Sequence, residues 1–202
     1  MRNLKVIIWY FPENSRKRRT LVLTGTFQII IDVVSALVGG LMLLRFWMHT
    51  VRANPPAQIG NFIYIITNWL VGPLSKVFPG HNRQKWASLL GSLLVATAVS
   101  TIRYLIIFPV FKPKIILVLT ALTFFNWVVY GIMGLLILQV IFSWVNPHAP
   151  LAPLVGSLNR PILSPFRRII PPIGGLDLSV LVVFVILQII NRYVPELLLG
   201  LI

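Results

Sequence analysis

The chain has 202 residues, of which 57% are hydrophobic and only 11% are charged, and its mean hydropathy is +0.87. Soluble domains carry about 25% charged residues, so this composition excludes an ordinary soluble domain and indicates an integral membrane protein. The charge is strongly positive, with 18 Lys and Arg against 4 Asp and Glu, and the absence of cysteine excludes disulfides and thiolate metal sites.

The first predicted elements are a basic N-terminal tail, 1–20, and a membrane-spanning helix, 21–44. The apolar patch within the tail, 6–11, is shorter than the core of a typical signal peptide, and no small-residue cleavage site follows the long run. We therefore expect an uncleaved first helix. The basic cluster 16–19 precedes it at the position where cations meet anionic headgroups.

Three further apolar runs predict three more spans, at 88–108, 115–144 and 178–190, the last one extending toward the C-terminus. A short connector, 109–114, separates the second span from the third. The sequence thus predicts an all-α polytopic membrane protein with four transmembrane helices. Lys and Arg are divided almost evenly between the two sides, which leaves the orientation of the termini open.

The long loops between spans contain a second kind of helix. Between 59 and 77 apolar residues recur every three or four positions, as in a helix that lies at the membrane interface. The segment 151–162 keeps the same spacing more weakly. Pro161 and Pro165 are expected to break or kink any helix there.

The two halves of the chain repeat one pattern. Sliding the sequence by 92 positions superposes the two long loops, with Pro73 on Pro165, Lys76 on Arg168 and Pro79 on Pro171. A shift of 94 aligns Leu21 with Ile115. We infer a tandem duplication of a two-span unit, with repeats at 21–108 and 115–202. Because each unit crosses the membrane twice, both repeats enter from the same side.

Asp32 is the one acidic residue well inside a predicted span, where an ionised carboxylate is costly. Two interpretations stay open: a proton or cation site, or a structural group that is protonated or paired. Arg103 lies near the end of the antiparallel second span, on the side where the first span begins. We therefore expect its long side chain to reach Asp32.

Small and polar side chains follow one face of each of the first two spans: Gln28, Ser35, Ala36, Gly39 and Gly40 on the first, and Ser88, Ser92, Ala96 and Ser100 on the second. Such faces let helix backbones approach closely, so helix packing is the expected role. Asn126 and Tyr130 on the third span, with Gln188 and Asn191 on the fourth, are expected to hydrogen-bond across the bundle.

No catalytic motif is present: the chain lacks GxSxG, HExxH, a P-loop and GxGxxG. The three histidines are scattered without a carboxylate at metal-ligand spacing, so no metal or other cofactor is expected. Asp177 precedes the fourth span and is expected to cap that helix. No basic face with interleaved aromatics lies outside the spans, which argues against nucleic-acid binding.

These motifs resemble the YggT family of bacterial membrane proteins. The resemblance rests on TNWLVGPLSKVFP at 67–79 in the first repeat and on NRPILSPFRRIIP at 159–171, followed by Gly-Gly-Leu-Asp, in the second. The chain departs from the family pattern at Ser75 and Lys76, where Arg-Arg is usual, and at Lys85, where Asp is usual. The second repeat has Gln139 at the position that matches Arg45.

The resemblance implies an integral protein of the bacterial inner membrane. It also implies roles linked in relatives to osmotic or ion-stress tolerance and, in organelles, to membrane-complex assembly, haem attachment and nucleoid or division phenotypes. Our first hypothesis is a non-enzymatic scaffold or assembly factor. In it the interfacial basic residues Arg45, Lys76, Arg167 and Arg168 contact anionic lipid or a partner complex. The alternative is a small oligomeric ion transporter or channel that uses Asp32.

Overall fold

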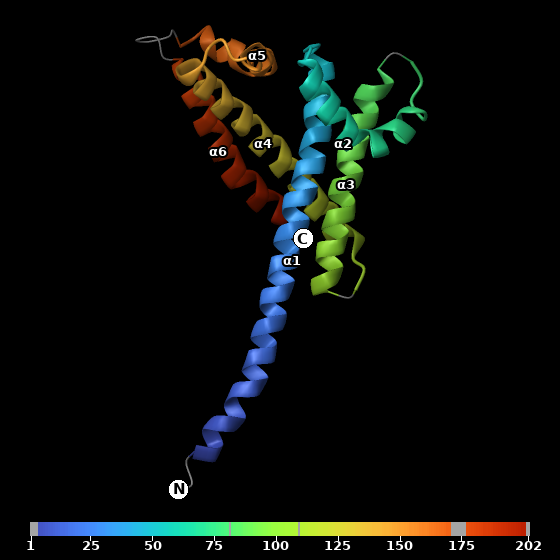
Figure 1. Ribbon diagram of the computed structural model, residues 1–202, viewed down its shortest axis with the longest axis vertical. Coiled ribbons are helices and arrows are strands. Elements are labelled where there is room, and N and C mark those ends of the chain that lie inside the picture. The colour runs from blue at the N-terminus through green and yellow to red at the C-terminus, as the bar shows by residue number, and fades with distance from the viewer. Residues whose placement is uncertain (1–3, 81, 109, 171–176, 201–202) are drawn as a thin grey trace.

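The computed structural model describes residues 4–80, 82–108, 110–170 and 177–200, with side chains from residue 25 onward. These residues form six helices: α1 (Leu4–Val51), α2 (Ala57–Ser75), α3 (Arg83–Ile107), α4 (Pro113–Val145), α5 (Ala152–Arg167) and α6 (Leu178–Leu199) (Figure 1). Four of them contain apolar stretches long enough to cross a membrane, at Gly25–Val51, Arg83–Ile107, Pro113–Val145 and Leu178–Leu199. The predicted all-α architecture with four spans is confirmed.

Three of the four spanning helices begin before their predicted starts, whereas α6 begins at Leu178 as predicted. The first helix was expected to begin at Leu21, but α1 begins at Leu4 and passes through the basic segment of the predicted tail. Lys and Arg are good helix formers, so a cluster of them ends the apolar run without ending the helix. For the same reason α3 begins at Arg83, five residues before the first apolar stretch at Ser88.

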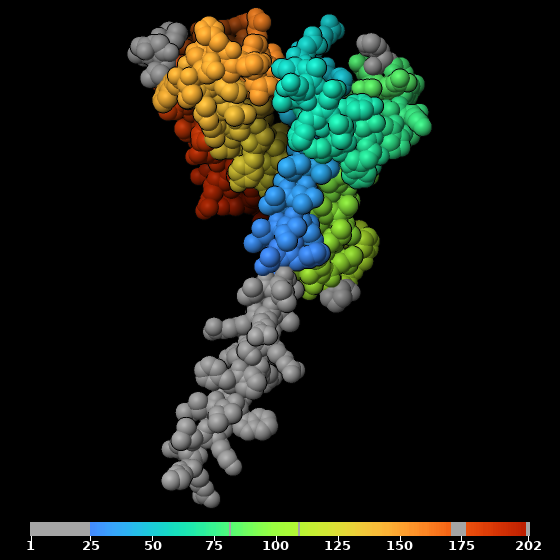
Figure 2. Space-filling model, viewed as in Figure 1, coloured from blue at the N-terminus to red at the C-terminus, as the bar shows by residue number. Residues whose placement is uncertain are grey.

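The helix ends reproduce the internal duplication. α1 and α4 end 94 positions apart, at Val51 and Val145, and α2 and α5 end 92 positions apart, at Ser75 and Arg167. The ends of α3 and α6, Ile107 and Leu199, are also 92 apart. We call α1–α3 repeat 1 and α4–α6 repeat 2. In both repeats the interfacial helix lies toward the same end of the bundle (Figures 1 and 2).

Within repeat 1, α1 and α3 pack along the small-residue face predicted on the second span. Ser88, Ser92, Ala96 and Ser100 are all buried. Gly91 lies on the same helix, and a Cβ added there would stand 3.2 Å from the Met42 sulfur. The small side chains therefore bring the two backbones close, as helix packing in lipid requires.

The two interfacial helices differ in placement and in outer face. α2 runs obliquely along α1 and α3, whereas α5 lies across the end of its repeat (Figure 1). α2 exposes large apolar side chains, among them Phe62, Ile65 and Trp69, whereas α5 exposes Arg160 and Pro161. The outer face of α2 suits the acyl region, and that of α5 suits the headgroups.

The expected break at the prolines of α5 is absent, because the helix contains both Pro161 and Pro165 in its interior. The two prolines are exposed and lie four positions apart, on the outer face. Proline on an exposed face is tolerated in a helix more easily than in the packed face, because a carbonyl that loses its N–H partner there can bond to water instead. The inner face buries Leu154, Val155, Leu158, Asn159 and Leu163, so the weaker sequence pattern forms a strongly one-sided helix.

Contacts between the repeats come from α3, which packs against α4, and from α1, which packs against both α4 and α5. The Trp47 indole Nε1 donates to the carbonyl of Leu158 at 3.0 Å, and Met48 and Ile63 share an apolar cluster with Leu154 and Leu158 of α5. Farther along the bundle the Trp127 ring lies against Gly39, where an added Cβ would clash with the ring. These contacts join repeat 1 to both α4 and α5.

Candidate functional site

A buried arginine links three helices of repeat 1. Arg45 of α1 is only 4% exposed. Its Nη1 donates to the Thr67 hydroxyl of α2 at 2.8 Å, and its Nη2 donates to Gln84 Oε1 of α3 at 3.3 Å. The guanidinium also lies 5.1 Å from the centroid of the Tyr64 ring. We call this set, Arg45 with Thr67 and Gln84, the first polar link.

This arrangement corrects the expectation that Arg45 is one of the basic residues available to lipid. An arginine near a span end usually extends its charge to the headgroups. Here α2 packs across the end of α1 and supplies a hydroxyl and an aromatic ring, so the charge is retained inside the protein. Charge-assisted hydrogen bonds of this kind offset part of the cost of burial.

Repeat 2 holds its interfacial helix with neutral amides at the matching positions. Asn159 of α5 is fully buried, and its Nδ2 donates to Gln139 Oε1 at 2.7 Å and to the Leu135 carbonyl at 2.8 Å. Gln139 matches Arg45 in the shift of 94, and Asn159 matches Thr67 in the shift of 92. We call Gln139 with Asn159 the second polar link.

Sequence reasoning missed Thr67, Gln84 and Asn159 as partners in these links. A usable signal was present in the repeat alignment, because it pairs a polar residue at the end of each first span with a polar residue in the middle of each interfacial helix. The match of Arg45 with Gln139 and the match of Thr67 with Asn159 together indicate that the first span contacts the interfacial helix in the same way in both repeats.

At the start of α6 an ion pair accompanies the helix cap. The Asp177 carboxylate accepts from the Ser179 N–H at 3.1 Å, which confirms the predicted cap. The same carboxylate accepts from Arg167 Nε at 2.7 Å.

Repeat 1 has neither residue of this ion pair, since Ser75 matches Arg167 and Lys85 matches Asp177. The Lys85 Nζ instead lies 5.6 Å from the centroids of the Phe46 and Trp86 rings.

Each interfacial helix is followed by an exposed cation and an exposed aliphatic residue. Lys76 and Val77 follow α2, and Arg168 and Ile169 follow α5; Val77 is 74% exposed and Ile169 is 80% exposed. Among the motif prolines, Pro73, Pro79 and Pro165 are also exposed, whereas Pro171 lies outside the described residues. The repeated signature is therefore a surface feature.

The two intramembrane charges meet as expected from the antiparallel spans. Arg103 Nη1 lies 3.3 Å from Asp32 Oδ1, and the two side chains are 44% and 43% exposed. They lie on α1 and α3, away from the end that carries α2 and α5. The pairing gives Asp32 a structural partner, while a transport role for this residue stays a prediction.

The other predicted intramembrane polar residues are brought together in part. Asn191 Nδ2 of α6 donates to the Tyr130 hydroxyl of α4 at 3.2 Å, a bond across the bundle of the kind expected. Gln28 and Asn126 are partly buried. Among the described residues, no group of three His, Asp or Glu side chains is arranged to hold a metal ion.

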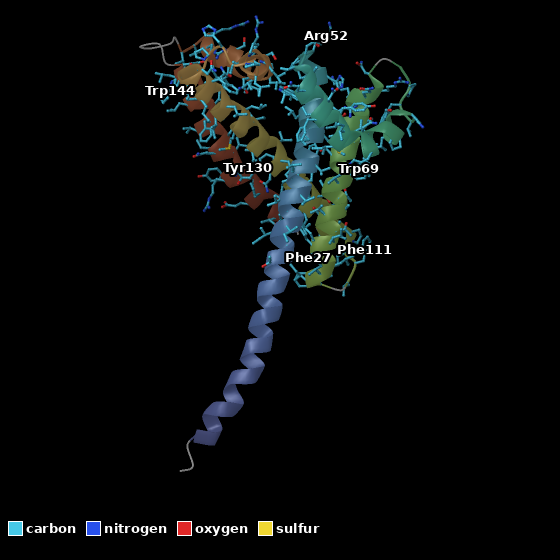
Figure 3. The ribbon with its side chains drawn as sticks, viewed as in Figure 1. Phe27, Arg52, Trp69, Phe111, Tyr130 and Trp144 are labelled. Atoms are coloured by element: carbon cyan, nitrogen blue, oxygen red, sulfur yellow. The ribbon has the colours of Figure 1, made fainter. Side chains whose placement is uncertain are left out.

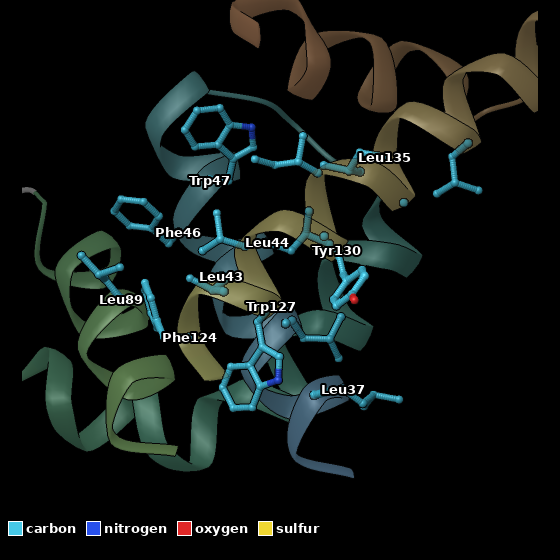
Figure 4. A pocket seen from close by; sticks show the side chains of 18 residues that line it. Leu37, Leu43, Leu44, Phe46, Trp47, Leu89, Phe124, Trp127, Tyr130 and Leu135 are labelled. Carbon is cyan, nitrogen blue, oxygen red and sulfur yellow. The ribbon is translucent and has the colours of Figure 1, made fainter. Parts of the chain in front are cut away.

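An apolar groove separates the two repeats at membrane depth. It has a volume of about 520 Å³ and lies chiefly between α1 and α4, with Leu37, Leu44, Trp127 and Tyr130 in its lining (Figure 4). Figure 3 shows how aromatic side chains such as Trp69, Trp144 and Phe27 are distributed over the bundle. The groove and these aromatics present surfaces suited to acyl chains.

Comparisons with known proteins match both repeats. The model of the CCB3/YggT family matches residues 24–108 and again 118–198. The chain is 31% identical over 177 residues to "Uncharacterized protein YggT" of Escherichia coli K12, covering 86% of this chain and 92% of that protein. It is also 31% identical over 172 residues to an uncharacterized protein of Pseudomonas aeruginosa, covering 82% and 86%. No solved structure matches the chain.

Proposed function

Because the chain belongs to the CCB3/YggT family, we propose that it is a non-enzymatic scaffold of the bacterial inner membrane. Its interfacial helices gather anionic lipid around an assembly or stress-tolerance complex. The observation that carries this proposal is the repeated surface signature, Lys76 with Val77 and Arg168 with Ile169. A cation beside an exposed aliphatic side chain is suited to lipid phosphate on one side and acyl chains on the other.

The structure narrows the set of cations that serve this role. Arg45 is buried in the first polar link, and Arg167 is paired with Asp177. Lys76 and Arg168 are exposed, and they occupy matching positions in the two repeats. The proposal therefore assigns lipid contact to Lys76 and Arg168. The packed helices of each repeat hold these two residues in place.

The test measures local lipid composition in nanodiscs that contain zwitterionic lipid and a minor anionic lipid with brominated chains. Bromine quenches nearby tryptophan, and both Trp69 and Trp144 are exposed. We expect quenching above the level set by the bulk lipid fraction, and a return to that level in the variant Lys76→Gln with Arg168→Gln. High salt should have the same effect.

The matched control is Lys112→Gln with Lys114→Gln, which also removes two exposed charges. These two residues lie at the start of α4, whereas α5 and Arg168 follow the other end of α4. This control should leave quenching unchanged. Equal quenching in all three proteins would contradict the lipid role. Affinity capture from native membranes then identifies any complex that the scaffold serves.

The second candidate, an ion transporter that uses Asp32, is supported by the partial exposure of this carboxylate at membrane depth. Its pairing with Arg103 favours the structural interpretation. Ion flux in proteoliposomes that disappears in Asp32→Asn would establish transport. If exchanging the charges in Asp32→Arg with Arg103→Asp rescues both single variants, the pair is structural.

A further inference from the structure

A basic hollow lies at the end of repeat 1 that carries the interfacial helix. It has a volume of about 1020 Å³ and is bounded by the end of α1, the turn before α2 and the start of α3. The charged or titratable side chains that line it are His49, Arg52, Arg83 and Lys85. This volume accommodates a small polar ligand or a lipid headgroup.

The described residues supply no anion to this hollow. Three of the chain's acidic side chains are described, and each one pairs with an arginine elsewhere: Asp32 with Arg103, Asp177 with Arg167, and Glu196 with Arg192. None of the acidic residues whose side chains the structure describes is in the lining. The positive charges of the hollow therefore repel one another and favour an external anion.

The backbone conformation of Arg52 adds a second observation. This residue follows the last residue of α1 and has φ of 55°, in the left-handed region. Glycine is the usual residue at such a helix end, and a residue with a Cβ is disfavoured there. An arginine maintained in this conformation, with its charge in the lining of the hollow, points to a role for the charge.

The start of α3 adds positive potential to the same place. Asn82 is the N-cap residue, but its side chain makes no capping hydrogen bond to the helix. The first-turn N–H groups of a helix favour an anion. In repeat 2 the corresponding helix, α6, is capped by the Asp177 carboxylate, and Lys85 occupies the matching position in repeat 1. An internal anion is thus replaced by a cation.

We propose that the hollow of repeat 1 binds a phosphate ester through Arg52, Arg83 and Lys85, either on a lipid headgroup or on a soluble molecule. The bound phosphate then meets the positive end of α3, as the Asp177 carboxylate meets that of α6, although α3 begins before the position that matches Asp177. This inference deepens the proposed function by naming a specific site. It uses residues other than Lys76 and Arg168, so the two proposals fail separately.

The experiment measures binding to the purified chain in a zwitterionic detergent, by thermal unfolding and by the change in tryptophan fluorescence that is lost in Trp86→Phe, since Trp86 neighbours Lys85. One arm adds glycerol phosphate, and the other adds short-chain phosphatidic acid in mixed micelles. We expect saturable binding in at least one arm, which identifies the source of the phosphate. A ligand that binds only the folded protein raises its unfolding temperature.

Arg52→Gly is the decisive variant, because glycine suits the left-handed backbone while the charge is lost. We expect it to fold at least as well as the unmodified chain and to bind about tenfold more weakly, the effect of losing one charge-assisted hydrogen bond. Arg83→Gln should weaken binding similarly. Lys76→Gln with Arg168→Gln should leave it unchanged. Binding that is absent in both arms, or insensitive to Arg52→Gly and Arg83→Gln, would overturn the proposal.

Discussion

Repeat 1 and repeat 2 fasten their interfacial helices by the same contact with different chemistry. In repeat 1 a buried guanidinium reaches Thr67 and Gln84, whereas in repeat 2 two amides, Gln139 and Asn159, bond to each other. The second polar link therefore buries no charge. The ion pair of repeat 2, between Arg167 and Asp177, lies at the surface instead. The comparison teaches that the position of the contact is maintained while its polarity has diverged.

This divergence gives the two halves different electrostatic surroundings at the start of their last helices. Repeat 2 satisfies the start of α6 with its own carboxylate, so that helix start needs no outside anion. Repeat 1 has Ser75 and Lys85 at the two positions of that pair and has a basic hollow beside them. At the start of its last helix, repeat 2 carries its own anion, whereas repeat 1 is open there to an outside anion.

The largest effect is expected from breaking the first polar link with Thr67→Val. The buried guanidinium loses its nearer acceptor, so the free energy of unfolding should fall by about 3 kcal/mol, the upper range for a hydrogen bond to a charged group. Unfolding in detergent measures this change. Thr97→Val is the control, because that exposed hydroxyl bonds only within its own helix. Equal losses in the two variants would show that the link is unimportant.

The second polar link should be weaker because it contains no charge. Asn159→Leu removes the donor to both Leu135 and Gln139 and leaves the acceptors buried without it. We expect a loss of about 2 kcal/mol in the same unfolding assay. A loss larger than that of Thr67→Val would reverse our ranking of the two repeats.

The junction between the repeats is tested by adding one methyl group at Gly39. A Cβ there would overlap the Trp127 ring, so Gly39→Ala should destabilise the protein by about 1.5 kcal/mol through overpacking. Gly40→Ala is a matched control, since a Cβ at Gly40 meets nothing within 4 Å. Unfolding temperatures that shift equally would place the Trp127 contact outside the packed interface.

The smallest effect is expected at the surface ion pair of repeat 2. Asp177→Ala removes the α6 cap together with the partner of Arg167 and should cost about 1 kcal/mol. Asp177→Asn retains a capping oxygen, so most of the stability should remain. The loss in Asp177→Ala is measured by thermal unfolding at low and high salt. A strong salt dependence would mean that the ion pair, rather than the cap, dominates.

Much of the fold follows from local sequence, but the polar links do not. The four spans and the two interfacial helices are marked by apolar runs and by spacing, and the Asp32–Arg103 contact follows from the antiparallel course of two spans. The burial of Arg45 depends on acceptors 22 and 39 positions away. Only the packing of both α2 and α3 against α1 brings these acceptors together, and an arginine at a span end gives no sign of it.

The contact between the Trp47 indole and the Leu158 carbonyl has a consequence for how the polypeptide can be divided. This hydrogen bond and the packing of the Trp127 ring against Gly39 hold repeat 1 and repeat 2 together independently of the connector between α3 and α4. Cutting the gene at that connector yields two fragments that carry complementary surfaces. We expect the two fragments, expressed separately in one membrane, to associate through these surfaces.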